Sequence, residues 1–177
     1  MSNYKNPADL GGADPSEGPT REALGRSRGG LSTKIHLAAD QRCRPLARIT
    51  TGGQRHDSIA FDAVMAGIRV LRPAGRGRPR TKPDTVLADK AYSASTIRDP
   101  LRRRRIHAVI PAKANEHLAR SGEFDTAAYR QRNVVERCIN KLKLFRALAT
   151  RYDKRNYIYL GTIDVATIKI WLRDPVP

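Results

Sequence analysis

The sequence is poor in acidic residues, cysteines and aromatic side chains. Only 17 residues are Asp or Glu, against 34 Lys or Arg, so the formal net charge of the 177 residues is +17. Two cysteines are too few for a disulfide framework or a cysteine zinc site. No apolar run reaches the roughly 18 residues that a membrane span needs, and the N-terminal stretch lacks the basic start and apolar core of a secretory signal. These absences exclude disulfide-rich secreted proteins and membrane-spanning proteins, and favour a cytoplasmic protein with no membrane partner.

The excess of positive charge indicates a polyanionic partner. Hydrophobic residues make up 40% of the chain, which is enough to build a core, so disorder does not account for the charge. A chain of this length typically forms one domain. Nucleic acid is the simplest partner for a folded protein that is this basic.

The order of apolar patterns predicts an α/β fold with a mixed sheet flanked by helices. Residues 1–30 are rich in glycine, proline and polar residues and indicate a flexible arm, which precedes a folded domain over residues 31–177. Two alternating runs, at 32–40 and 46–51, predict a β-hairpin. The later elements expected are helices over 58–71, 93–104 (interrupted at Asp99-Pro100), 125–149 and 156–172, and short strands at 85–89 and 107–111.

The helix expected over residues 125–149 carries a distinctive polar face. At about 100° per residue, its members fall within an arc of about 60°, away from the apolar side of the same helix. These members are Tyr129, Arg132, Glu136 and Lys143. The pattern fits an ordinary solvated face with salt bridges, or a carboxylate that holds a metal ion beside cations that contact nucleic-acid phosphates.

A second carboxylate, Asp89, ends the apolar run Val86-Leu87-Ala88. The carboxyl end of a buried strand is where α/β sheets place their functional sites. A plain strand-end or helix-cap role is the alternative.

A basic loop precedes this strand. Arg76-Gly77-Arg78-Pro79-Arg80 matches the core of an AT-hook, a segment that fits the narrow minor groove of A·T-rich DNA. General phosphate contact through Arg76, Arg78 and Arg80, or a plain solvated linker, are the alternatives. His56-Asp57 follows the hairpin, and its alternatives are a turn or cap role and a place in a functional site. We expect Asp57 or Ser58 to be the N-cap of the helix over 58–71.

Two signatures in this order resemble the catalytic domain of bacterial insertion-sequence transposases of the DDE class. They are LADKAYS at residues 87–93 and Y-x2-R-x3-E-x6-K from Tyr129 to Lys143. The likeness extends over residues 23–173 and implies an RNase H-like domain. It also implies that Asp89 and Glu136 are the second and third catalytic carboxylates and hold Mg²⁺ or Mn²⁺, while Tyr129, Arg132 and Lys143 contact phosphates.

The resemblance also implies the reaction and its partners. Such enzymes use two divalent ions to cut DNA at the transposon ends and to transfer the freed 3′-hydroxyl to target DNA. From the same resemblance we expect a homodimer in a synaptic complex, acting on DNA of the bacterial nucleoid.

The likeness is incomplete at its start. In the family the first catalytic Asp lies on the first strand, upstream of the segment that corresponds to GRSRGG at residues 25–30. Here the upstream stretch offers Asp9 and Asp14, and neither follows an apolar strand. We therefore expect a sheet that lacks its first strand, two of three carboxylates, and a chain that is weak or inactive without an upstream transposase segment. The alternatives are a non-catalytic DNA-binding remnant that occupies transposon ends or inhibits transposition, a nuclease of the same fold, and a basic protein of the ribosomal type.

Overall fold

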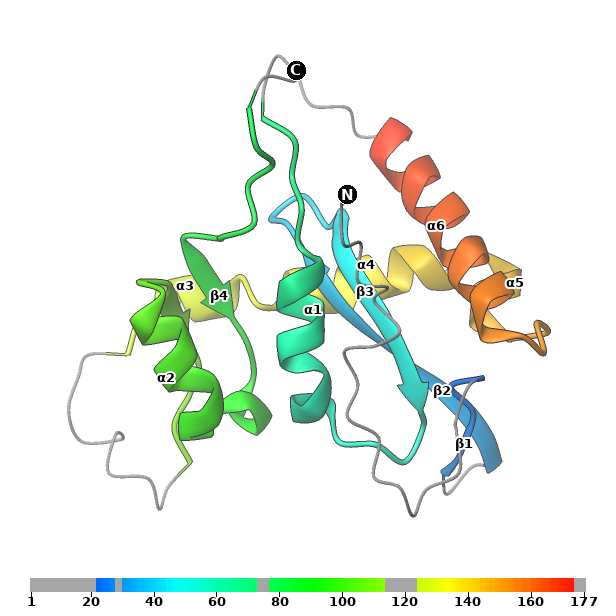
Figure 1. The fold of residues 1–177 in the computed structure, drawn as a ribbon, viewed down its shortest axis with the longest axis horizontal. Coiled ribbons are helices and arrows are strands. Elements are labelled where there is room, and N and C mark those ends of the chain that lie inside the picture. The colour runs from blue at the N-terminus through cyan, green and yellow to red at the C-terminus, as the bar shows by residue number, and fades with distance from the viewer. Residues whose placement is uncertain (1–21, 28–29, 73–76, 114–123, 174–177) are drawn as a thin grey trace, which may run out of the picture.

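The computed structural model describes residues 22–27, 30–72, 77–113 and 124–173 (Figure 1). Its strands are β1 (Gly25–Ser27), β2 (Gly30–Ala39), β3 (Pro45–Gly52), β4 (Thr85–Leu87) and β5 (His107–Val109). Its α-helices are α1 (Phe61–Gly67), α2 (Ser95–Arg103), α3 (Thr126–Arg130), α4 (Asn133–Lys143), α5 (Arg146–Ala149) and α6 (Asn156–Arg173), with the short 3-10 helices η2 (Asp57–Ala60) and η4 (Lys90–Tyr92).

The described strands form two separate sheets. In the first, β2 pairs with β1 and β3 in antiparallel fashion, with Thr33 opposite Gly52 and Ala38 opposite Ala47. In the second, β4 and β5 pair in parallel. The predicted α/β class and hairpin are confirmed, but the described strands do not form the single mixed sheet that the sequence predicted. No ladder within the described ranges joins the hairpin to β4.

The two faces of the hairpin carry different layers. Leu37 and Ala39 pack with Val134 and Cys138 on α4, and α4 passes behind the hairpin in Figure 1. The intervening Ala38 lies against the cluster that includes Met65 of α1, and α1 lies in front. The alternation of side chains along a strand thus separates an α1 layer from an α4 layer.

The hydrophobic core is divided in the same way. One cluster joins α1, α2 and the parallel strands through Met65, Ile68, Ile97, Leu101, Ile106 and Ile110. A second joins the helices of the C-terminal region to the opposite hairpin face through Leu142, Leu148, Tyr159, Ile163, Ala166 and Ile170. Each element therefore contributes one apolar stripe to one side of the hairpin.

The longest predicted helix is divided into three. After α3, Arg132 N–H donates to the carbonyl of Tyr129 (2.9 Å), and Val134 N–H to that of Gln131 (3.0 Å), so the chain makes three-residue turns in place of four-residue ones. The second break falls at Phe145, whose backbone is extended (φ −86°, ψ 110°). The prediction of a continuous helix over 125–149 was wrong, because the tight turns after Arg130 and the extended backbone of Phe145 interrupt the helical hydrogen bonding.

Two further helix predictions need correction. The helix expected over 93–104 runs through Asp99-Pro100 without interruption, and the Pro100 carbonyl accepts a hydrogen bond from Arg104 N–H (3.0 Å). The helix expected over 58–71 begins as η2 at Asp57 and, as α1, ends at Gly67. Neither Asp57 nor Ser58 is its N-cap, since His56 occupies that position and makes no side-chain capping hydrogen bond.

The predicted last helix is confirmed as α6. Its N-terminus receives the Glu22 carboxylate, which accepts a hydrogen bond from Asn156 N–H (2.6 Å). At the C-terminal end of α6, Trp171 Nε1 donates a hydrogen bond to the Pro45 carbonyl of the hairpin (2.9 Å). The outer side of α6 exposes the apolar side chains of Tyr157, Val165, Ile168 and Leu172. No helix in the described part of the chain is long and apolar enough to cross a membrane.

Candidate active site and nucleic-acid contacts

Asp89 lies directly beyond the paired end of β4. Leu87 is opposite Val109 in the parallel pair, and Asp89 then caps η4, its Oδ1 accepting a hydrogen bond from Ala91 N–H (2.8 Å). The side chain is half-buried. The cap role considered from the sequence is therefore present, and it engages one of the two carboxylate oxygens.

Tyr92, on the same short helix, connects Asp89 to the segment after the hairpin. Its ring packs against Phe61 of α1, with centroids 5.7 Å apart. Burial raises the pKa of the Tyr92 phenol to about 12, and the negative charges of Asp57 and Asp89 add to that effect. Asp57 and Asp89 thus both act on one half-buried phenol, although they follow different strands.

The polar face of the long helical segment forms a row in space. The Arg132 guanidinium lies over the Tyr129 ring at 5.3 Å, and Arg132 Nη2 is 3.6 Å from Glu136 Oε1. Gln131 and Arg132 keep helical backbone angles at the break (φ −73°, ψ −10° and φ −53°, ψ −31°), so the side chains stay on one side. Lys143, seven residues beyond Glu136, is exposed at the end of α4.

The basic loop is described only in part. Arg76 lies outside the described residues. Arg78 is exposed, and its carbonyl accepts a hydrogen bond from Arg72 Nε (3.2 Å). Arg80 forms an ion pair with Asp84 and donates from Nε to the Lys82 carbonyl (2.9 Å). The Arg80 guanidinium therefore already has an anionic partner within the chain.

A cleft of about 740 Å³ opens beside Asp89. Its lining comes from β2, η2, η4 and the segment after β5, and consists of Lys34, His56, Asp57, Ser58, Lys90, Ala91, Ala112 and Lys113. Lys34 Nζ is 3.1 Å from Asp57 Oδ1 and donates to the Arg55 carbonyl at 2.7 Å. These lysines could not be predicted as a group, because positions 34, 90 and 113 are far apart along the chain. Among the lining residues, the sequence patterns single out only His56-Asp57 and the part of LADKAYS that contains Lys90 and Ala91.

His36 lies behind Asp57 on the same hairpin face as Lys34. Its side chain is buried, with Nε2 2.7 Å from Thr51 Oγ1 and Nδ1 3.9 Å from Asp57 Oδ1. Burial lowers the pKa of His36 below 6.5; Asp57 opposes this shift and Lys34 adds to it. This is the environment of an ordinary buried, hydrogen-bonded histidine.

The donor set can be tested against a divalent ion. Asp89 and Glu136 supply carboxylate oxygens, which are the ligands that Mg²⁺ prefers. Among the residues that the structure describes, however, no three His, Cys, Asp or Glu side chains gather closely enough to hold a metal ion. The chemistry of each carboxylate fits such an ion, while the described residues include no cluster of three side chains that could hold it.

The fold and charge define a basic α/β protein with carboxylates at a strand end and on a helix. Residues 13–162 match the transposase DDE domain family, and the chain belongs to that family. Two relatives carry the name putative transposase, for insertion sequence elements IS402 of Burkholderia cepacia and IS6501 of Brucella ovis. They are 33% and 28% identical over 82% and 81% of this chain.

The two relatives differ in length. The match spans 63% of the Burkholderia protein and 100% of the Brucella protein. No solved structure matches this chain.

Proposed function

We propose that this chain carries out DNA strand cleavage and strand transfer at the ends of an insertion sequence. The observation that carries the proposal is the family match over residues 13–162. The names of the two relatives agree with it. The net charge of +17 supports DNA as the substrate, because a surface of this sign attracts the phosphate backbone.

In the proposed site, Asp89 and Glu136 hold Mg²⁺ or Mn²⁺ on an RNase H-like framework. The bound ions would stabilise the attacking and leaving oxygens of an in-line phosphoryl displacement. The Ala91 amide fixes one oxygen of Asp89, which orients the other away from the cap. Arg132, held between Tyr129 and Glu136, directs a planar cation toward a phosphate on the same side.

The remaining sequence predictions enter as parts of this proposal. Arg76, Arg78, Arg80 and Lys143 contact the DNA backbone. Two chains pair the two transposon ends in a synaptic complex, and an upstream transposase segment supplies the remaining carboxylate. The site of action is the DNA of a bacterial cell.

The number of carboxylates limits the expected rate. Because the described residues include no cluster of three metal-ligating side chains, we expect weak cleavage from the chain alone. A DNA-binding remnant that occupies transposon ends is the second candidate, favoured by the same shortage of ligands together with the high positive charge.

The proposal is tested by measuring cleavage and strand transfer of a labelled transposon-end duplex, with and without Mg²⁺ or Mn²⁺. Asp89→Asn and Glu136→Gln are expected to reduce the divalent-dependent product at least about 100-fold, as expected for loss of a group that stabilises the transition state. Asp62→Asn, which removes an exposed carboxylate of α1, is the matched control and should leave the product unchanged.

The two candidates give different outcomes. Product that persists in Asp89→Asn, or without a divalent ion, contradicts the metal-dependent reaction. Absence of product from every variant, with DNA binding equal in wild type and Asp89→Asn, supports the DNA-binding remnant instead.

A further inference from the structure

We propose that the cleft lined by Lys34, Lys90 and Lys113 binds the phosphodiester backbone of a DNA strand next to Asp89. This inference rests on the proposed function and deepens it, because it assigns a place on the chain to the DNA strand. Lys90 lies within LADKAYS, but none of the three lysines is among Tyr129, Arg132 and Lys143, to which the resemblance assigns phosphate contacts.

The charge of the lining favours an anion. The lining residues include three lysines and one acidic residue, Asp57, so the formal charge of the lining is +2 with His56 neutral. The three lysines come from three separate elements, β2, η4 and the segment after β5. A cleft lined mainly by one sign of charge focuses the electric field and raises the local concentration of ligands of the opposite sign.

Asp57 fixes one of these cations at the cleft. Its Oδ1 lies 3.1 Å from Lys34 Nζ, which also donates to the Arg55 carbonyl at 2.7 Å. Two partners hold the ammonium in one position, so less side-chain entropy is lost when a phosphate binds.

The size and chemistry of the cleft distinguish a strand from a small apolar ligand. Its volume of about 740 Å³ is within the range of small-molecule sites, but such sites have mainly hydrophobic and aromatic walls. This lining has no aromatic residue, and its apolar members are Ala91 and Ala112. Lysine ammonium groups with hydroxyl and imidazole neighbours suit phosphate oxygens.

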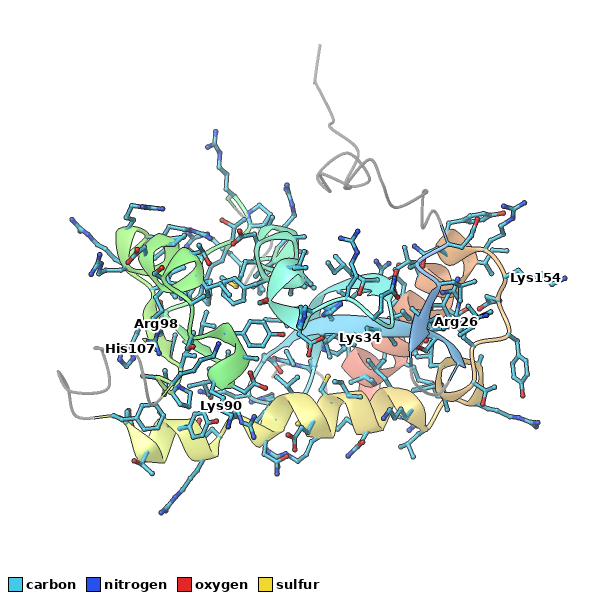
Figure 2. The ribbon with its side chains drawn as sticks, turned by 90° about the horizontal axis from the view of Figure 1, so that it is seen from below. Arg26, Lys34, Lys90, Arg98, His107 and Lys154 are labelled. Atoms are coloured by element: carbon cyan, nitrogen blue, oxygen red, sulfur yellow. The ribbon has the colours of Figure 1, made fainter. Side chains whose placement is uncertain are left out.

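The position of the cleft connects it to the candidate carboxylate. Lys90 and Ala91 follow Asp89 in the chain, and the Ala91 amide caps Asp89. Lys34 and Lys90 both line the cleft, and in Figure 2 Lys90 lies left of centre, Lys34 near the centre and Lys154 at the far right. A phosphate held by Lys90 would therefore lie near the proposed metal ligand.

The test uses the full chain and fluorescence anisotropy with a labelled transposon-end duplex, in EDTA, so that binding is measured without catalysis. Lys90→Ala/Lys113→Ala removes two cleft charges. Affinity falls as salt rises, and each lost phosphate contact reduces the steepness of log affinity against log salt by about 0.9. The slope of the double variant is therefore expected to be shallower than that of wild type by about 1.8. Between about 50 and about 200 mM salt, the variant should then lose about 12-fold less affinity than wild type.

Lys154→Ala/Arg173→Ala is the matched control, since it removes two exposed positive charges elsewhere. We expect its salt slope to stay near that of wild type. Equal slopes in wild type and the cleft variant would overturn the inference, as would an equal fall in the control variant.

Two further measurements are needed. One distinguishes a DNA strand from free phosphate as the ligand, and the other distinguishes failure of the cleft proposal from failure of the proposed function. If inorganic pyrophosphate displaces DNA from wild type at micromolar concentration, and the cleft variant resists that displacement, the site binds free phosphates and the strand assignment is overturned. Strand cleavage with Mg²⁺ is measured in parallel. If wild type cuts DNA but the cleft variant has the wild-type salt slope, the cleft proposal is overturned and the proposed reaction stands. Binding through the cleft without any cleavage overturns the proposed reaction and leaves the cleft supported.

Discussion

Ile163 is the side chain of α6 on which the second core cluster depends most directly. It is fully buried and packs with Leu142, Leu148 and Tyr159 beneath the hairpin. Its replacement by alanine therefore measures how firmly the C-terminal helices hold the sheet that carries Lys34.

The cost of Ile163→Ala follows from the removed atoms and the space they leave. Three buried carbons at about 0.8 kcal/mol each give about 2.4 kcal/mol for lost transfer free energy. A cavity that closes only in part adds about 1 to 2 kcal/mol. We expect the free energy of unfolding to fall by about 3.4 to 4.4 kcal/mol, a large share of the stability of a typical domain.

Ile168→Ala is the matched control on the same helix. The substitution is identical and brings the same small gain in helix propensity, but Ile168 is 57% exposed. Its expected effect is within about 0.5 kcal/mol. Urea unfolding of both variants can be followed by fluorescence of Trp171, the single tryptophan, whose indole contacts the hairpin.

The result that would refute this reasoning is equal destabilisation by the two variants. It would mean that the outer side of α6 is buried in solution, or that Ile163 contributes no more than an exposed residue. A coincident transition by circular dichroism is needed, because the comparison of free energies assumes two-state unfolding.

Two further predictions concern buried titratable groups. Burial holds the pKa of His36 below 6.5 in the folded protein. As the pH falls below about 6.5, this histidine is therefore protonated in the unfolded chain before it is protonated in the folded one. The free energy of unfolding should decrease over this range, until the pH passes the folded-state pKa. His36→Gln should show a smaller decrease between about pH 7.5 and about pH 5.5 in urea titrations, and an equal decrease in both proteins would contradict the assignment. Burial, with a smaller effect of Cys43, raises the pKa of the Cys138 thiol to about 12, so in a Cys43→Ser background Cys138 should resist a thiol reagent at about pH 8 until the protein unfolds. Rapid labelling of the folded protein would show that the thiol is accessible.

The elements with strong local patterns could be predicted from the sequence. Alternation at Thr33, Ile35 and Leu37 identified the first strand of the hairpin, and the apolar run through Ile163 identified α6. In these segments the periodic pattern and the tertiary packing require the same conformation.

The breaks in the long helical segment could not be predicted in this way. The turn at Phe145 brings both Leu142 and Leu148 to the cluster around Ile163. This conformation is set by contacts with α6, which lies later in the chain, so tertiary packing overrides a continuous helical pattern.

The candidate site was predicted unevenly for the same reason. Tyr129, Arg132 and Glu136 are close in sequence, and the predicted row of these side chains is present in the structure. The ion pair between Lys34 and Asp57 depends on how η2 returns over the hairpin, which no local spacing encodes. The catalytic roles assigned to Asp89 and Glu136 remain predictions, as do the phosphate contacts assigned to Tyr129, Arg132 and Lys143.

The alternation along β2 has a consequence for how the cleft can change. Lys34 lines the cleft, while its neighbour Ile35 packs against the C-terminal core. A slip of one residue in the pairing with β3 would exchange these faces, placing an ammonium group in the core and an isoleucine in the cleft. Burial of that unpaired charge would cost several kcal/mol. The register that stabilises the core thus fixes the cation of the cleft, and the cleft can be altered by substitution but not by shifting the strand.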